Sequence, residues 1–382
     1  MNRSYQKCRE LFLNSSSKLP LTIQRSSYEL PYSDPSGKPV STDFIKIYKN
    51  SPPKKWLLLT SGVHGLELFF GSAVQSHLLQ GISDEKYILP TDVGIIMAHA
   101  LNPWGSAWLR RVNINNVDLG RNFISNFPEI LEKYKTDPRH IEAQKIYRDI
   151  DEIINPQSFP LLGAADLLRI GYYFWKYGKS KFNFAMLSGQ RFKQRGAQFA
   201  GKSMDLEHRS FKAEIDKLLP KDSELVYHID LHTGLGEKGK ETFVVADEES
   251  NKAAIEIFGK KRVSFNTILG GEVDGALISG LKLAQKTEAK WLALTFEIGT
   301  TPIYKSYLAV RNEAIWHNQQ LWIEDFSRKE IQGINTDYYL SHRTKKEILE
   351  NFCPSSKEWQ DSALSVGLSG VSTIIKYLAS YR

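Results

Sequence analysis

The stretch LLLTSGVHGLE at residues 57–67 combines an apolar run, a glycine-flanked turn and two polar side chains. The run has the composition of a buried strand, and a helix candidate at 66–80 follows it. His64 and Glu67 stand three residues apart at the turn between them. Sites in open α/β sheets form at the carboxyl ends of strands, and a turn can bring a histidine nitrogen and a carboxylate to one zinc ion. A lone HxxE pair is more often a surface pair, so a site here needs support from other motifs.

Apolar runs bounded by turn signals recur along the chain outside this stretch. They predict strands at 44–48, 55–60, 93–98, 225–231, 242–246 and 291–296, with helices between several of them. Strands that alternate with helices pack as one sheet covered on both faces. We therefore expect an α/β fold with a mixed, mostly parallel central sheet and helices on both faces.

Two long stretches depart from this alternation. Residues 127–220 and 305–382 have mainly helical patterns, and no linker sets either of them apart. The sequence therefore predicts a single α/β domain over residues 1–382, with a helical insertion at about 127–220 and a helical C-terminal segment at about 305–382. Because the insertion directly follows a loop that contains arginines, we expect it to wall the candidate site.

The composition is that of an ordinary globular protein, with 41% hydrophobic and 24% charged residues in 382. Lys and Arg number 50 against 43 Asp and Glu, and the net charge of +7 is spread along the chain, which permits anionic partners without establishing one. Two cysteines exclude a disulfide scaffold and a four-thiolate metal site. The N-terminus lacks the apolar stretch of a secretory signal, and no run reaches the roughly 20 apolar residues of a membrane span. A soluble, cytoplasmic protein is expected.

Two further strand ends carry polar side chains. IDLHTG at 229–234 places His232 after an apolar run, with Asp230 on the same side because strand side chains alternate. His232 is a third candidate metal ligand, and Asp230 is placed to orient its ring. LALTFEIG at 292–299 carries Glu297, which is expected to emerge at the strand end, because burying an ionised carboxylate inside a sheet is costly. There it can act as a general base.

Residues 101–123 form a loop rich in asparagine, glycine and arginine. It contains LNPWG at 101–105, RRVN at 110–113 and NVDLGRNF at 116–123. Arginines beside a metal site bind a carboxylate through two parallel hydrogen bonds or neutralise an oxyanion. Each motif alone is weak. Three of the four lie at predicted strand ends, and together they indicate one catalytic site.

In this order, the motifs resemble those of the zinc carboxypeptidase family. The matching residues are HGLE at 64–67, Asn102, Pro103 and Gly105, NVDLGRNF at 116–123, His232, and TFE at 295–297. The chain looks closest to a poorly characterised bacterial carboxypeptidase-like branch, related to the aspartoacylase and succinylglutamate desuccinylase group. The resemblance covers about residues 20–325 and implies a zinc carboxypeptidase-like fold.

The resemblance also implies a metal centre and a general base. One zinc ion is assigned to His64, Glu67 and His232, which leave a fourth position for water, as in other catalytic zinc sites. Glu297 would take a proton from that metal-bound water and deliver it to the leaving amine. The family therefore implies hydrolysis of an amide bond.

The other implied roles fall on the arginine loop. Arg111, rather than its neighbour Arg110, resembles the arginine that polarises the scissile carbonyl and stabilises the oxyanion. Arg121 resembles the arginine that recognises the terminal carboxylate of the substrate. Asp118 matches the carboxylate that holds the first zinc histidine.

Two departures from the family concern substrate recognition. The family has asparagine before the carboxylate-binding arginine, where this chain has Gly120, and Asn122 or Asn113 is expected to supply the missing amide. The family also has a substrate-covering tyrosine between the last zinc histidine and the catalytic glutamate, whereas residues 233–296 contain no tyrosine. Neither departure touches the metal ligands or the base.

Three functions stay open at this point. The leading one is zinc-dependent amide hydrolysis of the carboxypeptidase type, on a small peptide with a carboxylate near the scissile bond. The second is deacylation of N-acyl amino acids, because DLHT at 230–233 is closer to the motif of the aspartoacylase group. The third is a non-catalytic binding protein on the same fold, for which YYFWKY at 172–177 offers a partner surface, although aromatic residues at helical spacing are usually core.

The expected partner is a small peptide or an N-acyl amino acid as substrate. The stretch at 176–195 interleaves basic and aromatic residues, but no recognised nucleic-acid motif accompanies it. We therefore expect no nucleic-acid partner and no membrane partner.

Overall fold

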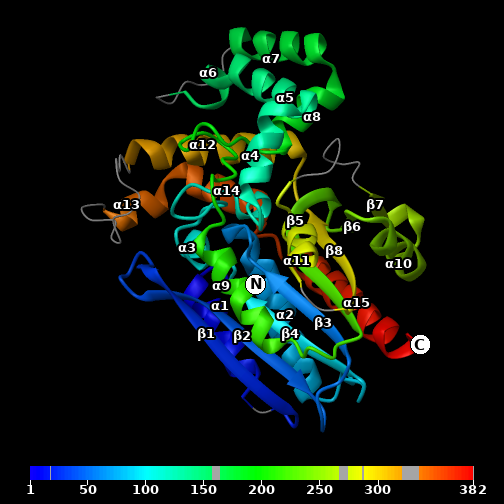
Figure 1. Cartoon of the computed structure of the whole chain (residues 1–382). Coiled ribbons are helices and arrows are strands. Elements are labelled where there is room, and N and C mark those ends of the chain that lie inside the picture. The colour runs from blue at the N-terminus through cyan, green and yellow to red at the C-terminus, as the bar shows by residue number, and fades with distance from the viewer. Residues whose placement is uncertain (18, 157–163, 266–273, 286–287, 321–334, 382) are drawn as a thin grey trace.

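The predicted strands pair into one sheet at the centre of the molecule (Figure 1). The computed structural model of the protein describes residues 1–17, 19–156, 164–265, 274–285, 288–320 and 335–381. Within these ranges the sheet has eight strands in the order β1-β2-β4-β3-β5-β8-β6-β7. They are β1 (Thr22–Ser33), β2 (Pro39–Tyr48), β3 (Lys55–Ser61), β4 (Val93–His99), β5 (Leu225–Lys238), β6 (Glu241–Val245), β7 (Val263–Phe265) and β8 (Lys290–Gly299).

The strand directions are mixed. The four central strands, β4, β3, β5 and β8, run parallel to one another. On one side β2 is antiparallel to β4, and β1 is antiparallel to β2. On the other side β6 is antiparallel to β8, and β7 is parallel to β6. The predicted α/β fold with a mixed, mostly parallel sheet is confirmed.

Each of the six predicted strands overlaps an observed one. Strands β1 and β7 were not predicted, because β1 is a largely polar, half-exposed edge strand and β7 has only three residues. Strands β5 and β8 run further than predicted, past the polar residues His232 and Glu297. Glu297 therefore lies inside a paired strand and does not emerge beyond its end, which corrects the expectation from the sequence.

Alternation along the central strands separates two hydrophobic cores. In β3, Leu57 and Leu59 belong to one cluster and Trp56 and Leu58 to another, because successive side chains point to opposite faces. The first core is covered by α1 (Tyr5–Ser15), α2 (Leu68–Ser83), α10 (Glu248–Phe258) and α15 (Lys357–Ser380). The second is covered by α9 (Leu206–Leu218) and α11 (Leu277–Ala284). Helices thus cover both faces, as predicted.

The stretch between Arg121 and β5 contributes further helices. They are α4 (Phe127–Thr136), α5 (Pro138–Asp149), α6 (Asp151–Ile154), α7 (Ala164–Tyr177) and α8 (Lys179–Leu187), followed by α9. Side chains of α5, α6 and α8 form a hydrophobic cluster of their own, which includes Ile146, Tyr147 and Phe184. Figure 1 shows α5 to α8 above α12 (Ile303–Gln320), away from the sheet. Residues 157–163 of the predicted insertion lie outside the described residues.

The chain after β8 is mainly helical where it is described. It forms α12, α13 (Thr336–Ser341), α14 (Arg343–Phe352) and α15, and residues 321–334 and 382 lie outside the described residues. Elsewhere a short helix, α3 (Pro103–Ala107), and 3₁₀ helices at Gly65–Glu67, Leu119–Arg121 and Lys260–Arg262 complete the described elements. The division into one α/β domain with a helical insertion stays a prediction.

Among the described residues, α15 alone is long and apolar enough to cross a membrane by length and composition. Its buried side chains, which include Trp359, Val371 and Ile374, belong to the core on one face of the sheet. Packing in that core accounts for part of the apolar composition of this helix, and one such helix is weak evidence for a membrane span.

Candidate metal centre

The turn that carries His64 and Glu67 packs closely against the arginine-containing loop at 101–123 through backbone contacts. The N–H of Gly65 donates to the carbonyl of Arg111 at 3.1 Å. A Cβ on Gly65 would lie 2.3 Å from the carbonyl carbon of Gly105, so only glycine fits at this position. The side chain of Asn102 accepts from the N–H of Gly105 and donates to the carbonyl of Arg111. The asparagine and glycines of these motifs therefore fix the backbone from which Arg111 extends.

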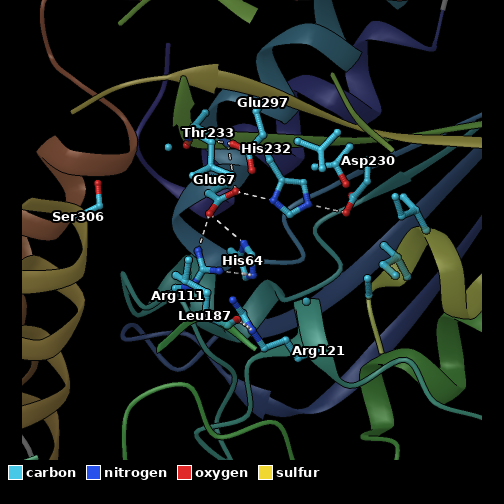
Figure 2. Close-up of a pocket in the computed structure, with 18 of the residues that line it drawn as sticks. His64, Glu67, Arg111, Arg121, Leu187, Asp230, His232, Thr233, Glu297 and Ser306 are labelled. Carbon is cyan, nitrogen blue, oxygen red and sulfur yellow. Dashed lines mark hydrogen bonds and ion pairs between the residues drawn. The ribbon is translucent and has the colours of Figure 1, made fainter. Parts of the chain in front are cut away.

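The three predicted metal ligands meet next to the carboxyl end of β3: His64 and Glu67 follow that strand, and His232 lies within the adjacent strand β5. Glu67 Oε1 lies 2.9 Å from His64 Nδ1, and Glu67 Oε2 lies 2.9 Å from His232 Nδ1. One potential ligand atom from each residue lies within 4.8 Å of the other two, and all three side chains are buried. Figure 2 shows the two imidazoles and the carboxylate pointing toward one another.

The second nitrogen of each imidazole is held by an aspartate. His64 Nε2 lies 3.1 Å from Asp118 Oδ1, and His232 Nε2 lies 2.6 Å from Asp230 Oδ2. For His232, the Asp230 acceptor favours a ring proton on Nε2 and leaves Nδ1 as the electron-pair donor. His64 Nε2 also lies 2.7 Å from Arg111 Nη2, which can only donate, so the contacts of His64 orient its ring without fixing its tautomer. Both Nδ1 atoms face Glu67, so the two aspartates orient the donor set of a metal ion.

The negatively charged side chains of this cluster favour a positive charge between them. Burial opposes the protonated form of His232, but Asp230 and Glu67 outweigh burial and raise its pKa well above the usual range. Burial alone would raise the pKa of Glu67, whereas His64 and His232 lower it overall. A site that draws a proton so strongly is equally suited to a divalent cation. Two imidazole nitrogens and one carboxylate are donors that suit zinc, so the residues present fit such an ion.

Glu297 stands beside His232 on the next strand. The two residues are direct partners in the parallel register of β5 and β8. Glu297 Oε2 accepts the N–H of Leu235 at 3.3 Å, and its side chain lines the same pocket as the ligands. Burial, with the negative charge of Glu67, raises the pKa of Glu297 to about 7, although His232 and Arg111 oppose this shift. A carboxyl group with a pKa near neutrality is suited to exchanging a proton.

The structure separates the two adjacent arginines. Arg111 lines the pocket, and its Nη1 donates to Glu67 Oε1 at 2.9 Å. Arg110 is fully buried elsewhere, where Nε donates to Glu313 at 3.0 Å and Nη2 donates to Asn116. Lys345 Nζ lies 2.6 Å from the same Glu313 carboxylate, which links α12 and α14 to the loop. Of the two arginines, only Arg111 lies in the pocket.

Arg121 is held beside Asp118, the aspartate that contacts His64. Its Nη1 pairs with Asp118, and its Nε donates to the carbonyl of Leu187 at 2.6 Å. Burial would raise the pKa of Asp118, but Arg121, Arg111 and His64 hold that pKa well below its usual range. The carboxylate therefore stays ionised between two arginines and a histidine, and Arg121 lines the pocket.

Gly120 departs from the family for a steric reason. A Cβ at this position would lie 2.5 Å from His64 Nε2 and 3.1 Å from His64 Cε1. The imidazole of His64 thus takes the space that a side chain at 120 would need. The amide that the family carries before its arginine has no room here.

Asn122 lies elsewhere than the sequence suggests. Its Nδ2 donates to the carbonyls of Ala200 and Ser203, and its Oδ1 accepts the N–H of Asp205 at 2.7 Å. The side chain is fully buried and is not among those that line the pocket. The predicted substrate contact of Asn122 is therefore corrected: its amide ties the arginine loop to the loop before α9. Asn113 is likewise occupied, since its amide nitrogen donates to Asp205 and Glu207.

A cavity of about 200 Å³ opens over these residues. Side chains of α12 and α14, such as Val310 and Phe352, and residues 276–279 line it together with the metal cluster. Leu187 and Gln198, from the stretch between Arg121 and β5, also line it. Leu187 also accepts a hydrogen bond from Arg121, so part of the insertion reaches the site, and the expectation that the insertion as a whole walls it stays a prediction.

Several residues that support the site were not predicted. The N–H of Thr233 donates to Glu67 Oε2 at 3.1 Å, and Thr60 Oγ1 donates to Asp230 Oδ1 at 2.7 Å. Thr60 has a signal in the sequence, because it is a polar residue that directly follows the apolar run at 56–59. Tyr307 of α12 also lines the pocket, and its hydroxyl donates to the thioether of Met186. No spacing in the sequence indicates that α12 reaches the metal cluster.

Solved metallo-carboxypeptidases are among the structures to which the chain is similar. The carboxypeptidase A from Helicoverpa armigera is 11% identical, with a TM-score of 0.43, over 98% of this chain and 74% of that chain. The metallo-carboxypeptidase from Pseudomonas aeruginosa is 10% identical, with a TM-score of 0.44, over 99% and 69%. A putative metallopeptidase from Shewanella amazonensis is 14% identical, with a TM-score of 0.40, over 83% and 93%. Identities this low transfer neither a reaction nor a substrate to this chain.

None of the curated proteins compared with the chain matches it. One protein-family model does match, over residues 1–366, and its description is a protein of unknown function, DUF2817. That description fits the expectation of a poorly characterised branch. Because the match spans nearly the whole chain, the protein belongs to the DUF2817 family.

Proposed function

We propose that the protein is a zinc-dependent amide hydrolase of the carboxypeptidase type, with one zinc ion per chain. The observation that carries this proposal is the pair of oriented imidazoles, His64 and His232, that flank the Glu67 carboxylate beside Glu297. A zinc ion held by these ligands supplies Lewis acidity, which polarises a carbonyl and lowers the pKa of water. Among the described residues the cluster offers three such ligands, whereas a purely structural zinc site is closed by a fourth protein ligand.

Glu297 is the proton carrier in this proposal. A carboxyl group with a pKa near 7 accepts a proton from the attacking water and gives it to the leaving amine within one turnover. Its backbone partner, the N–H of Leu235, holds one oxygen and leaves the other for that exchange.

In this proposal, Arg111 and Arg121 contact two different negative charges of the substrate. Arg111 lies against Glu67 and His64, where charge develops on the scissile carbonyl oxygen, so we assign it to the oxyanion. Arg121 lies further from Glu67 and is anchored through Nε and Nη1, which leaves Nη2 for a substrate carboxylate. A substrate with a carboxylate near its scissile amide satisfies both arginines.

The walls of the cavity favour a small substrate. A space of about 200 Å³ with apolar side chains around it suits a short peptide with an uncharged terminal residue. The same walls accommodate an N-acyl amino acid, whose carboxylate also stands next to the scissile amide, and DLHT at 230–233, which resembles the motif of the aspartoacylase group, supports this second candidate. Deacylation of N-acyl amino acids is therefore the alternative reaction.

A substrate panel tests the proposal and separates the two reactions. Zinc-loaded protein is assayed on C-terminal dipeptides and tripeptides and on N-acetyl and N-succinyl amino acids. The class with the higher kcat/KM identifies the reaction. No turnover of either class by protein that holds one zinc ion would contradict both and would favour a non-catalytic binding protein.

A further inference from the structure

Helix α7 carries an exposed apolar face that the proposed function does not use. Leu168 and Trp175 are 74% and 79% exposed, and Leu167 and Tyr172 are more than half exposed. These four residues recur at the spacing of one helix face, and we call them the α7 stripe. The sequence favoured a buried aromatic cluster here. The structure corrects that expectation for Tyr172 and Trp175.

The opposite face of α7 explains why the stripe points outward. Tyr173 and Tyr177 pack against the hydrophobic cluster of α5, α6 and α8, and the hydroxyl of Tyr177 donates to Asp149. Asp166, the acidic residue of the helix, interacts electrostatically with Arg311 in the body of the protein. The helix is thus anchored by its inner face. In Figure 1 it forms the outermost layer above the sheet.

Cationic side chains border the stripe. Arg169 and Lys176 are seven residues apart, so they lie along one edge of it, and Lys179 follows at the start of α8. Arg169 has a loose ion pair with Glu152, at 3.4 Å between two exposed groups, which binds it weakly. The ammonium of Lys176 lies within 6 Å of the Tyr172, Tyr173 and Tyr177 rings. Residues 164–181 contain four cations against one acidic group.

We propose that the α7 stripe is a docking surface for an anionic lipid bilayer. Helices that lie in a membrane interface have leucine and aromatic side chains on one face and lysine or arginine at its border. Trp and Tyr settle at the level of the headgroups, and the cations meet the negative surface potential. A single convex helix fits a flat surface, whereas a folded protein partner would usually require a larger, complementary patch.

Two other occupants fit less well. A second copy of this chain presents a border of the same charge, which opposes the pairing of two stripes. Nucleic acid would need free cations along 176–195, but Lys181 is paired with Glu142 at 2.8 Å and Lys193 with Asp151. Arg191 is buried and donates to backbone carbonyls. The lipid surface matches both the apolar and the cationic part of the stripe, and the proposal stands against the expectation from the sequence of no membrane partner.

Vesicle sedimentation of the full-length protein tests this proposal without reference to hydrolysis. The vesicles are equimolar phosphatidylcholine and phosphatidylglycerol, compared with phosphatidylcholine alone. The wild type is expected to sediment with the anionic vesicles and much less with the neutral ones. Leu168→Glu with Trp175→Glu is expected to weaken binding by about tenfold or more, because two apolar side chains no longer enter the interface. Arg169→Gln with Lys176→Gln is expected to weaken it about fivefold per charge.

The control is Leu283→Glu, compared with the single variants Leu168→Glu and Trp175→Glu, because it places one negative charge at a leucine of α11 that is 84% exposed. It is expected to bind like the wild type, and circular dichroism checks that all variants are folded. Equal sedimentation of the wild type and the stripe variant would overturn the proposal. So would a stripe-dependent dimer in sedimentation velocity without vesicle binding, which would assign the face to a second copy. Retention on DNA that depends on Arg169 and Lys176 but not on the stripe would overturn it as well.

Discussion

His232 on β5 and Glu297 on β8 are direct partners in adjacent parallel strands. His232 directs its Nδ1 toward Glu67. Burial raises the pKa of the Glu297 carboxyl group to about 7. The sheet register itself therefore brings the proposed metal ligand and the proposed base together. No flexible loop has to close to assemble them.

The aspartates behind the histidines are expected to control metal affinity. In Asp230→Asn, the amide accepts the His232 Nε2 proton more weakly, so Nδ1 becomes a poorer donor. We expect zinc affinity to fall roughly 10–100-fold, measured by competition with a fluorescent chelator. Asp222→Asn, an exposed aspartate near the other end of the same strand, is the control and should bind zinc like the wild type. Unchanged affinity in Asp230→Asn would show that the aspartate does not orient the ligand.

Gly120→Ala is expected to displace the other proposed histidine ligand, His64. Its Cβ would lie 2.5 Å from His64 Nε2, so the imidazole has to move away from Asp118 and Glu67. We predict weaker zinc binding together with loss of turnover. Gly171→Ala, where a Cβ meets no atom within 4 Å, serves as the matched control. Normal zinc affinity in Gly120→Ala would contradict this prediction. It would show that zinc binding does not depend on the position of the His64 imidazole seen here.

The adjacent arginines are expected to give opposite phenotypes. Arg111→Gln should retain zinc and melt normally, while kcat falls by about 10²–10³-fold because an oxyanion donor is lost. Arg110→Gln should lower the free energy of unfolding by about 3 kcal/mol, since it breaks a fully buried pair with Glu313 that Lys345 only partly replaces. Kinetics and thermal melts of the two proteins measure this contrast. A catalytic defect in Arg110→Gln at unchanged stability would reverse the assignment.

The pH dependence of hydrolysis is expected to report Glu297. A general base acts in its ionised form, so kcat/KM should rise as pH increases through the pKa of this group and fall below it. Burial sets that pKa at about 7, and a cation bound at Glu67 favours the ionised form, so the acidic limb should lie at or below pH 7. A rate that is independent of pH between 4 and 7 in the zinc-loaded enzyme would argue against a carboxylate base.

The metal cluster could be predicted from the sequence because its residues follow strands whose direction is readable. His64 follows an apolar run and a glycine-flanked turn, and His232 and Glu297 are polar residues near the ends of the predicted apolar strands. Parallel strands bring their carboxyl ends to one edge, so the three motifs converge without any further information. The alternation of side chains in a strand likewise places Asp230 behind His232.

Other features depend on contacts between segments far apart in the chain. Arg110 and Arg111 are identical in type and adjacent in a loop, and only Glu313 on a distant helix decides which one is buried. The amide of Asn122 is occupied by the loop at 200–205, which no local pattern indicates. In α7 both faces carry large apolar side chains, so periodicity cannot tell which face packs on Tyr147 and its neighbours and which remains exposed.

The measurement that tests the central claim most directly is the hydrolytic rate of zinc-loaded wild type and Glu297→Gln on the best substrate of the panel, with zinc content determined on the same samples. The account predicts one zinc ion per chain in both proteins. It also predicts a rate in Glu297→Gln that is lower by about 10²–10⁴-fold, because the amide cannot carry the proton. A Glu297→Gln protein that hydrolyses the substrate at the wild-type rate, or a wild type that turns over without zinc, would contradict it.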